Sequence, residues 1–435
     1  MSNKSYINIF WFRRDLRLED NTALYHALNS GEEVLPIFIL DKDLLGDIED
    51  KSDARLTFIF NQLSKLNKSL LQYGSSIQII NDNPLSAFKF LLKKYRIKAV
   101  FLNDEYEPYT ISRDKTVKDF LDLNGVEFNC YKDHVIFHKN DILNNSGLPF
   151  KVYSAYRKKW INKFEKSRIR SFSSEKSLQN CYKGPVRNKF RPEDIGLKEK
   201  KILFPLKTFD LTKIQNYSQD RDFPYLDNTT RLGVHLRYGT ISIRKAFNVG
   251  FRYSQTWVNQ LIWREFFSMI LFHFPHVVTS SFKIKYDKID WINNSEDFDI
   301  WCNGKTGYPI VDAGMRQLNT TGFMHNRVRM ITASFLTKHL LIDWRWGEAY
   351  FAKKLLDYEL ASNNGSWQWA AGTGTDAQPY FRIFNPSAQA KKFDPENIYI
   401  TKWLPEYPNN NYPKPIIEHT FARQRAINTY KKALL

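Results

Sequence analysis

Strand-like and helix-like patterns alternate through the first 131 residues, and this alternation limits the fold more than any other feature. The apolar run at residues 7–12 is typical of a buried strand. Apolar side chains recur on one helical face across residues 57–70. Strands that alternate with helices predict βαβ units and a parallel sheet. Further strands are expected at 34–40, 76–80, 99–102 and 126–131.

The same patterns divide the chain into three parts. Residues 4–135 predict a Rossmann-like α/β domain with a five-stranded parallel sheet. The pattern loosens at 136–205, which is expected to be an interdomain linker carrying a helix around 154–166. Residues 206–435 predict an all-α domain. Its helices are expected at 243–251, 256–272, 307–318, 325–339 and 347–355, and residues 421–435 are expected to form a short basic helix or tail.

Charge and cysteine content narrow the function classes. The formal net charge is 64 − 46 = +18, which favours a polyanion such as DNA as partner. The three cysteines are far apart and form neither a metal spacing nor a disulfide framework. The N-terminus has no apolar signal core, and no window reaches eighteen uninterrupted apolar residues. We therefore expect a reduced, cytoplasmic, monomeric protein without membrane contact. The loop at 13–17 lacks GxGxxG, which argues against a dinucleotide in the usual place.

The helical part carries an unusual group of aromatic and amide side chains. Residues 361–366 are expected to form a small, amide-rich turn, and Trp367 and Trp369 follow it on either side of Gln368. Indoles stack on flat heterocycles and can give an electron to an excited partner. Such a segment suits a flavin on one side and an unstacked base on the other. Ordinary core packing is the alternative for any single tryptophan.

Two other segments place polar and aromatic residues on single helical faces. Gln260, Trp263, Arg264 and Phe267 share a face, as do Asn326, Arg329 and Met330. Arg329 lies in an apolar neighbourhood and needs a carboxylate, for which Asp357 and Glu359 are candidates. His325 is expected to be a structural hydrogen-bonding residue. Residues 229–233 combine small hydroxyls with the start of a helix, which is typical of an anion site.

Three motifs in the helical part resemble the photolyase/cryptochrome family. They are Trp263-Arg264-Glu265-Phe266, Lys305-Thr306-Gly307-Tyr308-Pro309 and Gly372-Thr373-Gly374-Thr375-Asp376-Ala377. The resemblance covers residues 12–406, and it is closest to the class I photolyases of cyclobutane pyrimidine dimers (CPDs). It implies FAD inside the helical domain and repair by a carbon–carbon lyase, in which excited reduced FAD gives an electron to a dimer flipped out of DNA.

The resemblance also implies the residues around the cofactor. Asn363 is expected at flavin N5, where a neutral amide does not repel an anionic reduced ring. Cryptochromes of plants and animals place Asp or Cys there, which favours repair over signalling. The implied electron-transfer chain is Trp367, Trp344 and Trp291. The implied FAD-binding set is Tyr217, Thr229, Thr230, Arg231, Leu232, Gly233, Asn326, Arg329, Asp357, Tyr358, Glu359 and Asn363.

The implied lesion pocket lies between Trp263 and Trp369, with arginines on the DNA face to contact phosphates. The full implied set is Arg221, Gln260, Trp263, Arg264, Asn326, Arg327, Met330, Trp369 and Arg382. Photolyases of (6-4) photoproducts carry histidines in place of Asn326 and Met330, which disfavours that lesion. Two positions depart from the pattern: Gly233 where many relatives have Ser, and Gln260 where many CPD enzymes have Glu. Gln260 predicts retained repair with altered efficiency.

Three alternatives remain open from the sequence. They are a (6-4) photolyase, a blue-light receptor without repair, and a light-independent, basic nucleic-acid-binding flavoprotein. A second, antenna chromophore, either a folate or a deazaflavin, is expected in the α/β domain, with Glu107 as a candidate contact. Val278 and Thr279 stand at positions that contact a folate in relatives and would replace those contacts poorly.

Overall fold

The computed structural model describes residues 5–46, 50–184, 191–409 and 411–435. The chain forms two compact units. The first comprises residues 1–138, 163–208 and 232–249, and the second comprises 139–162, 209–231 and 250–435. The region 136–205 thus contributes residues to both units, and the domain boundaries at 135 and 205 stay a prediction.

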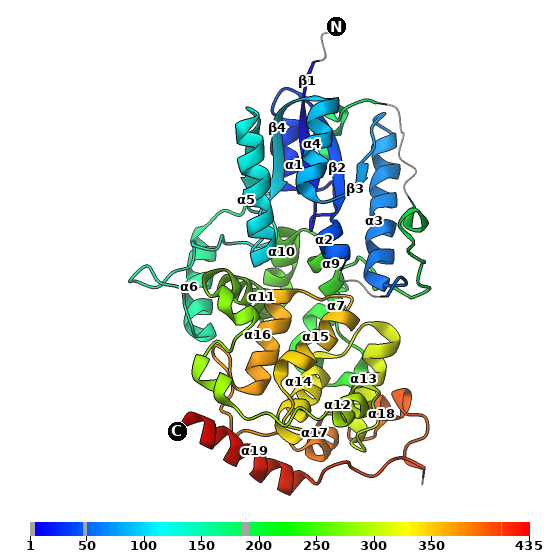
Figure 1. Ribbon diagram of the computed structural model, residues 1–435, viewed down its shortest axis with the longest axis vertical. Coiled ribbons are helices and arrows are strands. Elements are labelled where there is room, and N and C mark those ends of the chain that lie inside the picture. Colours follow the sequence, from blue (N-terminus) through cyan, green and yellow to red (C-terminus); the bar gives the residue numbers. More distant parts are fainter. Residues whose placement is uncertain (1–4, 47–49, 185–190, 410) are drawn as a thin grey trace. The chain divides into compact units, whose positions relative to one another are not determined.

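The first unit is built on a parallel sheet of five strands in the order β3-β2-β1-β4-β5, as the sequence predicts (Figure 1). Trp11 at the centre of the sheet pairs with Ile37 of the neighbouring strand. The order reverses direction between β1 and β4, which makes their carboxyl ends the topological switch point. The strands are β1 (Tyr6–Phe12), β2 (Glu33–Leu40), β3 (Gln78–Asn81), β4 (Arg96–Asn103) and β5 (Glu127–Tyr131).

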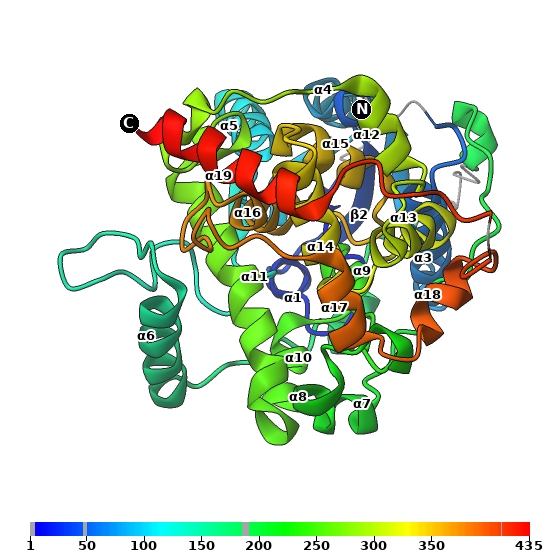
Figure 2. The same ribbon diagram turned by 90° about the horizontal axis from the view of Figure 1, so that it is seen from below.

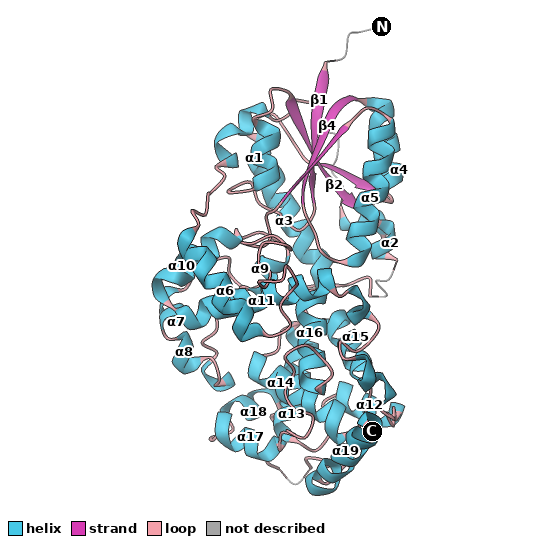
Figure 3. Cartoon of the chain, turned by 90° about the vertical axis from the view of Figure 1, so that its left-hand side faces the viewer, coloured by secondary structure: helices cyan, strands magenta, loops and turns pink. Residues whose placement is uncertain are grey.

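Helices cover both faces of this sheet, because successive strand side chains point to opposite sides (Figure 3). Phe10 and Phe12 pack with α1 (Thr22–Leu28) and α3 (Ala54–Leu71), whereas Ile9 and Trp11 pack with α4 (Pro84–Lys94) and α5 (Pro108–Leu123). Near-continuous apolar strands are the signature of a sheet buried on both faces. The unit's other elements are α2 (Lys42–Leu45), η1 (Ser174–Asn180), η2 (Pro192–Ile195) and α9 (Gly233–Arg237).

Every regular element formed by the described residues of the second unit is a helix. Its main core gathers large buried side chains of α12 to α16, among them Trp301, Trp344 and Trp367. The helices α6 (Tyr153–Lys166) and α10 (Ile243–Tyr253) each contribute residues to both units. The first helices after α6 are α7 (Leu211–Gln215), α8 (Tyr217–Asp220), η3 (Pro224–Leu226), α11 (Gln255–His273), η4 (Pro275–Val278), η5 (Ile284–Lys288) and α12 (Ser295–Cys302). They are followed by α13 (Pro309–Thr321), α14 (Asn326–Ser334), η6 (Phe335–His339), α15 (Trp344–Lys354), α16 (Leu360–Ala371), α17 (Pro386–Phe393), α18 (Ile398–Trp403) and α19 (His419–Leu434).

The C-terminal helix α19, red in Figures 1 and 2, closes one side of the second unit. Its Tyr430 is fully buried and packs against Tyr286 of η5 and Leu341. Lys338 of η6 lies over the Tyr430 ring, 3.5 Å from the centroid. The expected basic terminal helix is therefore present, and it is amphipathic rather than free on the surface.

One expectation about a helical segment was wrong. Residues 361–366 do not form a turn, because α16 runs through them as a regular helix to Ala371. The small residue Gly365 serves packing instead: a Cβ at this position would lie 2.2 Å from Cδ1 of Phe267 on α11. The helix expected at 325–339 is present, with α14 from Asn326 to Ser334 continued by a π-helical turn to His339. Such turns interrupt the 3.6-residue period that the sequence reasoning assumed.

Candidate functional site

Two ion pairs hold helices α11 and α14 against the start of α16. Arg329 of α14 donates to both carboxylate oxygens of Asp357, at 3.2 and 3.1 Å. Arg264 of α11 donates to Glu359 at 2.8 Å, and the Ser362 hydroxyl donates to the other oxygen at 2.9 Å. Of the two candidate carboxylates, Asp357 is thus the ion-pair partner of Arg329. Each charge is shielded from water and depends on its partner to offset desolvation, so the pairs fix where the chain enters α16.

Asn363 lies in the first turn of α16, only 8% exposed. Its Nδ2 donates to the backbone oxygen of Glu348 at 3.1 Å and to Oε1 of the same residue at 2.8 Å. Burial raises the pKa of Glu348, against the opposing effect of this hydrogen bond. Both amide hydrogens are therefore used within the protein. The side-chain oxygen of Asn363 has no partner among the described residues and is left to accept from a ligand.

The expected anion site at 229–231 has the backbone and side chains for that role. Arg231 has a φ of +50°, a left-handed conformation that costs a non-glycine residue about 1–2 kcal/mol. Its guanidinium pairs with Asp227 and lies over Phe323, 4.6 Å from the ring centroid. Thr229 and Thr230 are half-buried, and their hydroxyls make no hydrogen bond within the described parts of the chain. Strain of this kind is typical of functional sites.

The remaining members of the expected FAD set lie near the ends of short helices. Tyr217 opens α8 and is half-buried, and Tyr358 precedes α16 beside the two ion pairs. Leu232 is buried, and Gly233 is the first residue of α9; both belong to the first unit. Each of these positions is compatible with a ligand contact, and their role in binding FAD stays a prediction.

Trp367 and Trp344, the first two members of the expected electron-transfer chain, lie on helices that pack against each other. Trp367 of α16 is buried, and its ring lies directly against the backbone of α15, because a Cβ at Gly347 would be 2.1 Å from its Cη2. Trp344 is the first residue of α15, less than one turn before Gly347. Its Nε1 is buried and has no hydrogen-bond partner among the described residues.

Trp291, the third member, lies on the segment between η5 and α12 and is half-buried. This segment is fastened to the start of α15, since the Asp343 backbone N–H donates to the Asn293 side chain at 2.8 Å. Tyr430 stands against Trp291 with the ring centroids 5.8 Å apart. The three tryptophans therefore run from a buried helix, through a second buried position, to a partly exposed one.

Helices α11 and α16 lie side by side and run in the same direction. Arg264, midway along α11, pairs with Glu359 at the N-cap of α16, and Phe267 further along α11 meets Gly365 further along α16. Trp263 precedes Arg264, whereas Trp369 lies nine residues beyond the first residue of α16, about 14 Å of helix rise. Trp263 thus lies midway along α11, and Trp369 lies near the C-terminal end of α16.

Three residues expected to contact the lesion keep polar or polarisable atoms available. Gln260 uses one N–H in a long hydrogen bond to the Thr256 carbonyl, 3.4 Å, and its Oε1 has no partner within the described residues. Asn326 is exposed at the start of α14, and its Nδ2 faces the Met330 sulfur at 3.8 Å one turn later. These side chains are placed on two helices, α11 and α14.

The arginines expected to contact phosphates differ in whether their side chains already pair with a carboxylate of the protein. Arg327 donates to Asp222 at 2.8 Å, and Arg221 lies 3.8 Å from the same carboxylate. Arg264 is mostly buried in its ion pair. Arg382 is exposed and makes no side-chain contact within the described residues. Only Arg382 of this group is a freely available cation.

His325 has the structural role that the sequence predicts. It is the N-cap of α14, where its side chain accepts a hydrogen bond from the Arg327 backbone N–H at 3.2 Å. Burial and, to a smaller extent, the neighbouring Arg329 lower the pKa of His325 to about 4. The imidazole is therefore neutral near pH 7, as an N-cap acceptor requires.

Sequence reasoning missed Glu348 and Tyr153, although each contacts a residue that it named. Glu348 holds the amide of Asn363, and Tyr153 stacks on Trp263 with ring centroids 3.6 Å apart and an interplanar angle of 9°. Neither belongs to a motif. Tyr153 lies in the stretch whose pattern loosens, and no local signal in the sequence links it to a site more than one hundred residues away.

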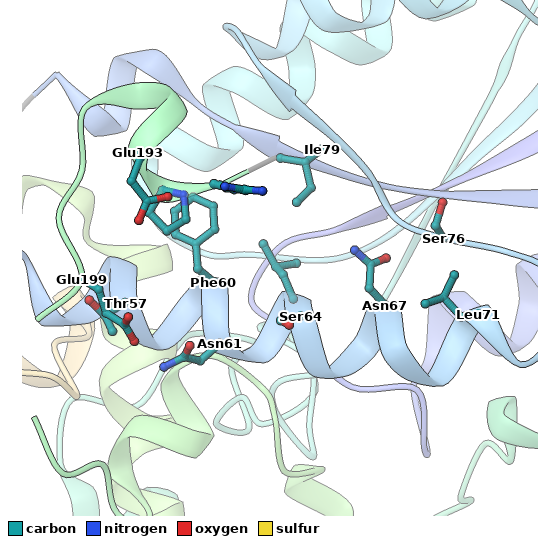
Figure 4. Close-up of a pocket in the computed structure, with 13 residues that line it drawn as sticks. Thr57, Phe60, Asn61, Ser64, Asn67, Leu71, Ser76, Ile79, Glu193 and Glu199 are labelled. Atoms are coloured by element: carbon teal, nitrogen blue, oxygen red, sulfur yellow. The ribbon is translucent and has the colours of Figure 1, made fainter. Parts of the chain in front are cut away.

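In the first unit, Glu107 takes part in ion pairs with two arginines. Its carboxylate pairs with Arg14 at 2.9 Å and with Arg237 at 3.3 Å. A hollow of about 460 Å³ lies elsewhere in this unit, between α3, β3 and residues 191–199 (Figure 4). Phe60 and Ile79 supply apolar walls there. The position of an antenna chromophore stays a prediction.

Within the described residues, no helix is long and apolar enough to cross a membrane, and no group of three or more His, Cys, Asp or Glu side chains could hold a metal ion.

Comparisons with known proteins cover nearly the whole chain. A family model described as DNA photolyase matches residues 8–174, and one described as the FAD binding domain of DNA photolyase matches residues 257–409. The deoxyribodipyrimidine photo-lyase of Buchnera aphidicola is 35% identical over 98% of this chain and 97% of its own length. The enzyme of that name from Vibrio cholerae is also 35% identical, over 98% and 100%.

Solved structures agree in fold. A bacterial class III photolyase from Agrobacterium tumefaciens superposes with a TM-score of 0.87 at 31% identity, over 100% of this chain and 98% of that one. An archaeal photolyase from Sulfolobus tokodaii that holds two FAD molecules superposes at 0.80 with 34% identity, over 98% and 99%. A cryptochrome from Synechocystis superposes at 0.83 with 25% identity, over 99% and 100%.

Proposed function

The chain belongs to the DNA photolyase family, and from this premise we propose that it is a lyase that uses blue light to reverse cyclobutane pyrimidine dimers in DNA. The observation that carries the proposal is the Asn363 amide, held by Glu348 with its oxygen free. A neutral acceptor at this position suits a reduced flavin that carries negative charge, which is the state that repair requires.

The donor set fits FAD. Arg231, with its strained backbone, and the unpaired hydroxyls of Thr229 and Thr230 would hold the phosphates. Asp357, oriented by Arg329, and the Asn363 oxygen would hold the polar edge of the isoalloxazine. When bound and reduced, FAD supplies on excitation the electron that opens the cyclobutane ring. The protein's contribution is to orient the cofactor and to exclude water from it.

The tryptophans would keep this cofactor in its reduced state. Trp367 is buried at the inner end of the series and Trp291 is half-buried at its outer end. An electron lost by Trp367 is replaced from Trp344 and then from Trp291, which leaves the missing electron near solvent, where a reductant can supply it. This relay serves activation and not the repair step.

On the DNA side, Gln260 and the indoles would recognise the flipped lesion. One N–H and the free Oε1 of Gln260 offer a donor and an acceptor, which match the edge of a thymine. Trp263 on α11 and Trp369 on α16 would contact the dimer's rings. Met330 and Asn326 stand where (6-4) photolyases carry histidines, which supports the CPD as substrate. Assignment to class I stays a prediction, because a class III photolyase superposes well.

One experiment separates this proposal from its rivals. Purified protein is reconstituted with FAD, reduced, and mixed with oligonucleotides that contain either a CPD or a (6-4) photoproduct. We expect blue light to restore thymines in the CPD oligonucleotide only, with no change in darkness. Reversal of the (6-4) product alone would make it a (6-4) photolyase. Flavin binding without reversal of either lesion would indicate a receptor.

A further inference from the structure

One face of helix α6 packs against helix α11. Trp160 donates from Nε1 to the buried Glu265 at 2.6 Å, and Arg157 donates from Nε to the Asn259 side chain at 2.6 Å. Tyr153 lies on the same face, because positions i, i+4 and i+7 align on a helix. Residues 153–162 thus belong to the wall around α11, although their sequence pattern suggested a linker.

Two hydrogen bonds hold Tyr153 itself, and a third holds the residues before it. Its hydroxyl donates to the Asn259 carbonyl at 2.8 Å, and its backbone N–H donates to Asp376 at 3.1 Å. The Thr375 hydroxyl donates to the Lys151 carbonyl at 2.7 Å, which fastens the preceding residues to the same loop. This loop follows α16, where Gly374 packs on the backbone of Trp369. Tyr153 therefore sits between the helix that carries Trp263 and the loop that begins beside Trp369.

The Tyr153 ring covers one face of the Trp263 indole. The two rings are stacked at 3.6 Å and 9°. Phe266 meets Trp263 nearly at a right angle, with centroids 5.6 Å apart, and Phe267 lies at 5.3 Å and 34°. Three aromatic rings thus fix the indole, and only Tyr153 stacks parallel to it. Among the described residues no second ring stacks parallel to the indole, so its other face has no stacked partner.

We propose that Tyr153 is a positioning residue for lesion recognition: it holds Trp263 in the orientation in which its other face stacks on the flipped pyrimidine dimer. The inference rests on the proposed function, and it adds to the lesion-recognition site a residue that belongs to none of the sequence motifs. An indole that is already ordered does not lose side-chain freedom on binding. Ordering one side chain typically reduces affinity by about two- to tenfold, which sets the size of the expected effect.

The test compares Tyr153→Leu with Tyr153→Phe in the FAD-loaded protein. The leucine variant removes the stacked ring, and we expect its Kd for CPD-containing duplex to rise about three- to tenfold. Its Kd for undamaged duplex, its photoreduction rate and its repair yield per photon at saturating DNA should equal those of wild type. The phenylalanine variant keeps the ring and loses only the hydrogen bond to Asn259, so its Kd should stay within about twofold of wild type.

A double-mutant cycle removes the purely structural explanation. In a Trp263→Leu background, Tyr153→Leu should add little, because the side chain that it positions is gone. Lys158→Ala, at an exposed position of the same helix, controls for changes in α6. An unchanged Kd in Tyr153→Leu, equal losses for damaged and undamaged DNA, or additive effects in the cycle would overturn the inference. If wild type itself neither binds nor repairs CPDs, the proposed function fails first, and the inference falls with it.

Discussion

At the scale of single residues, Asn363 decides whether the cofactor site tolerates a reduced, negatively charged ring. In Asn363→Asp, a carboxyl would face both that ring and the Glu348 side chain, whose pKa burial already raises. Like charges at such a distance disfavour each other. We expect FAD to remain bound, and the reduced state to reoxidise in air at least about tenfold faster, which corresponds to about 1.4 kcal/mol. Absorbance after photoreduction measures this rate.

Ser366→Asp provides the matched control for Asn363→Asp. Ser366 lies on the same helix less than one turn later but is exposed, so the added charge is screened by solvent. Its reoxidation rate should match wild type. Equal rates in Asn363→Asp and wild type would show that the amide does not face the reactive part of the ring.

Trp367 and Trp301 offer a second matched pair of residues. Both indoles are buried in one core, with ring centroids 6.1 Å apart, but only Trp367 belongs to the expected electron-transfer chain. Trp367→Phe should slow photoreduction of oxidised FAD at least about tenfold and leave repair by chemically reduced enzyme unchanged. Trp301→Phe should lose stability because the Thr332 carbonyl loses its hydrogen bond, yet photoreduce normally. Both photoreduction rates are measured by illuminating the oxidised proteins with an external electron donor. Equal slowing in the two variants would contradict the assignment of Trp367 to the electron-transfer chain.

The role of a single residue could be predicted from the sequence where it followed from the residue's own type and its immediate neighbours along the chain. Arg329, on an apolar helix face, required a carboxylate, and Asp357 supplies it. His325 preceded a helix and caps it. Tyr153 could not be found in this way, since its partner Trp263 lies 110 positions away and the stacking arises only when α6 packs on α11. Contacts of this kind depend on tertiary structure, which periodicity does not encode.

At the scale of elements, the parallel sheet could be predicted and helix α16 could not. The three central strands β1, β2 and β4 are largely apolar on both faces, and helical stretches separate the strands, so the pattern is strong. In α16, by contrast, residues 361–366 combine Ser, two Asn and Gly, which favour turns in isolation. Packing overrides that preference: Asn364 donates to the Val277 carbonyl at 2.8 Å, and Gly365 admits Phe267.

The carboxyl ends of β1 and β4 hold an element-scale charge cluster with a defined pH dependence. Glu105 follows β4 and lies 3.0 Å from Arg113 and 3.4 Å from Arg13. Burial alone would raise the pKa of Glu105, but these arginines outweigh it and lower the pKa to about 2. A depressed pKa stabilises the fold fully above the unfolded value of about 4.3, and this contribution is lost as pH falls toward 2.

Glu105→Gln should therefore be less stable than wild type by about 3 kcal/mol at pH 7, because buried arginines lose their counter-charge. The difference should shrink as the pH falls from 4.5 toward 2, where the wild-type carboxylate is neutralised as well. Urea unfolding at a series of pH values measures it. Glu127→Gln, at an exposed position of β5, should match wild type throughout. A difference that stays constant down to pH 3 would show that Glu105 does not carry this titration.

At the scale of the whole molecule, the net charge of +18 predicts salt-sensitive binding to DNA, but the arginines do not contribute alike. Arg382 is exposed, and its side chain makes no hydrogen bond, ion pair or ring contact within the described residues. Arg382→Ala should therefore weaken binding to damaged and to undamaged duplex equally. The slope of log Kd against log salt should fall by about 1. Arg264→Ala removes the buried counter-charge of Glu359 and should instead destabilise the protein by about 3–5 kcal/mol with an unchanged slope. Binding titrations at several salt concentrations, paired with thermal unfolding, separate the two effects, and a reduced slope in Arg264→Ala would place that residue on the DNA face despite its ion pair.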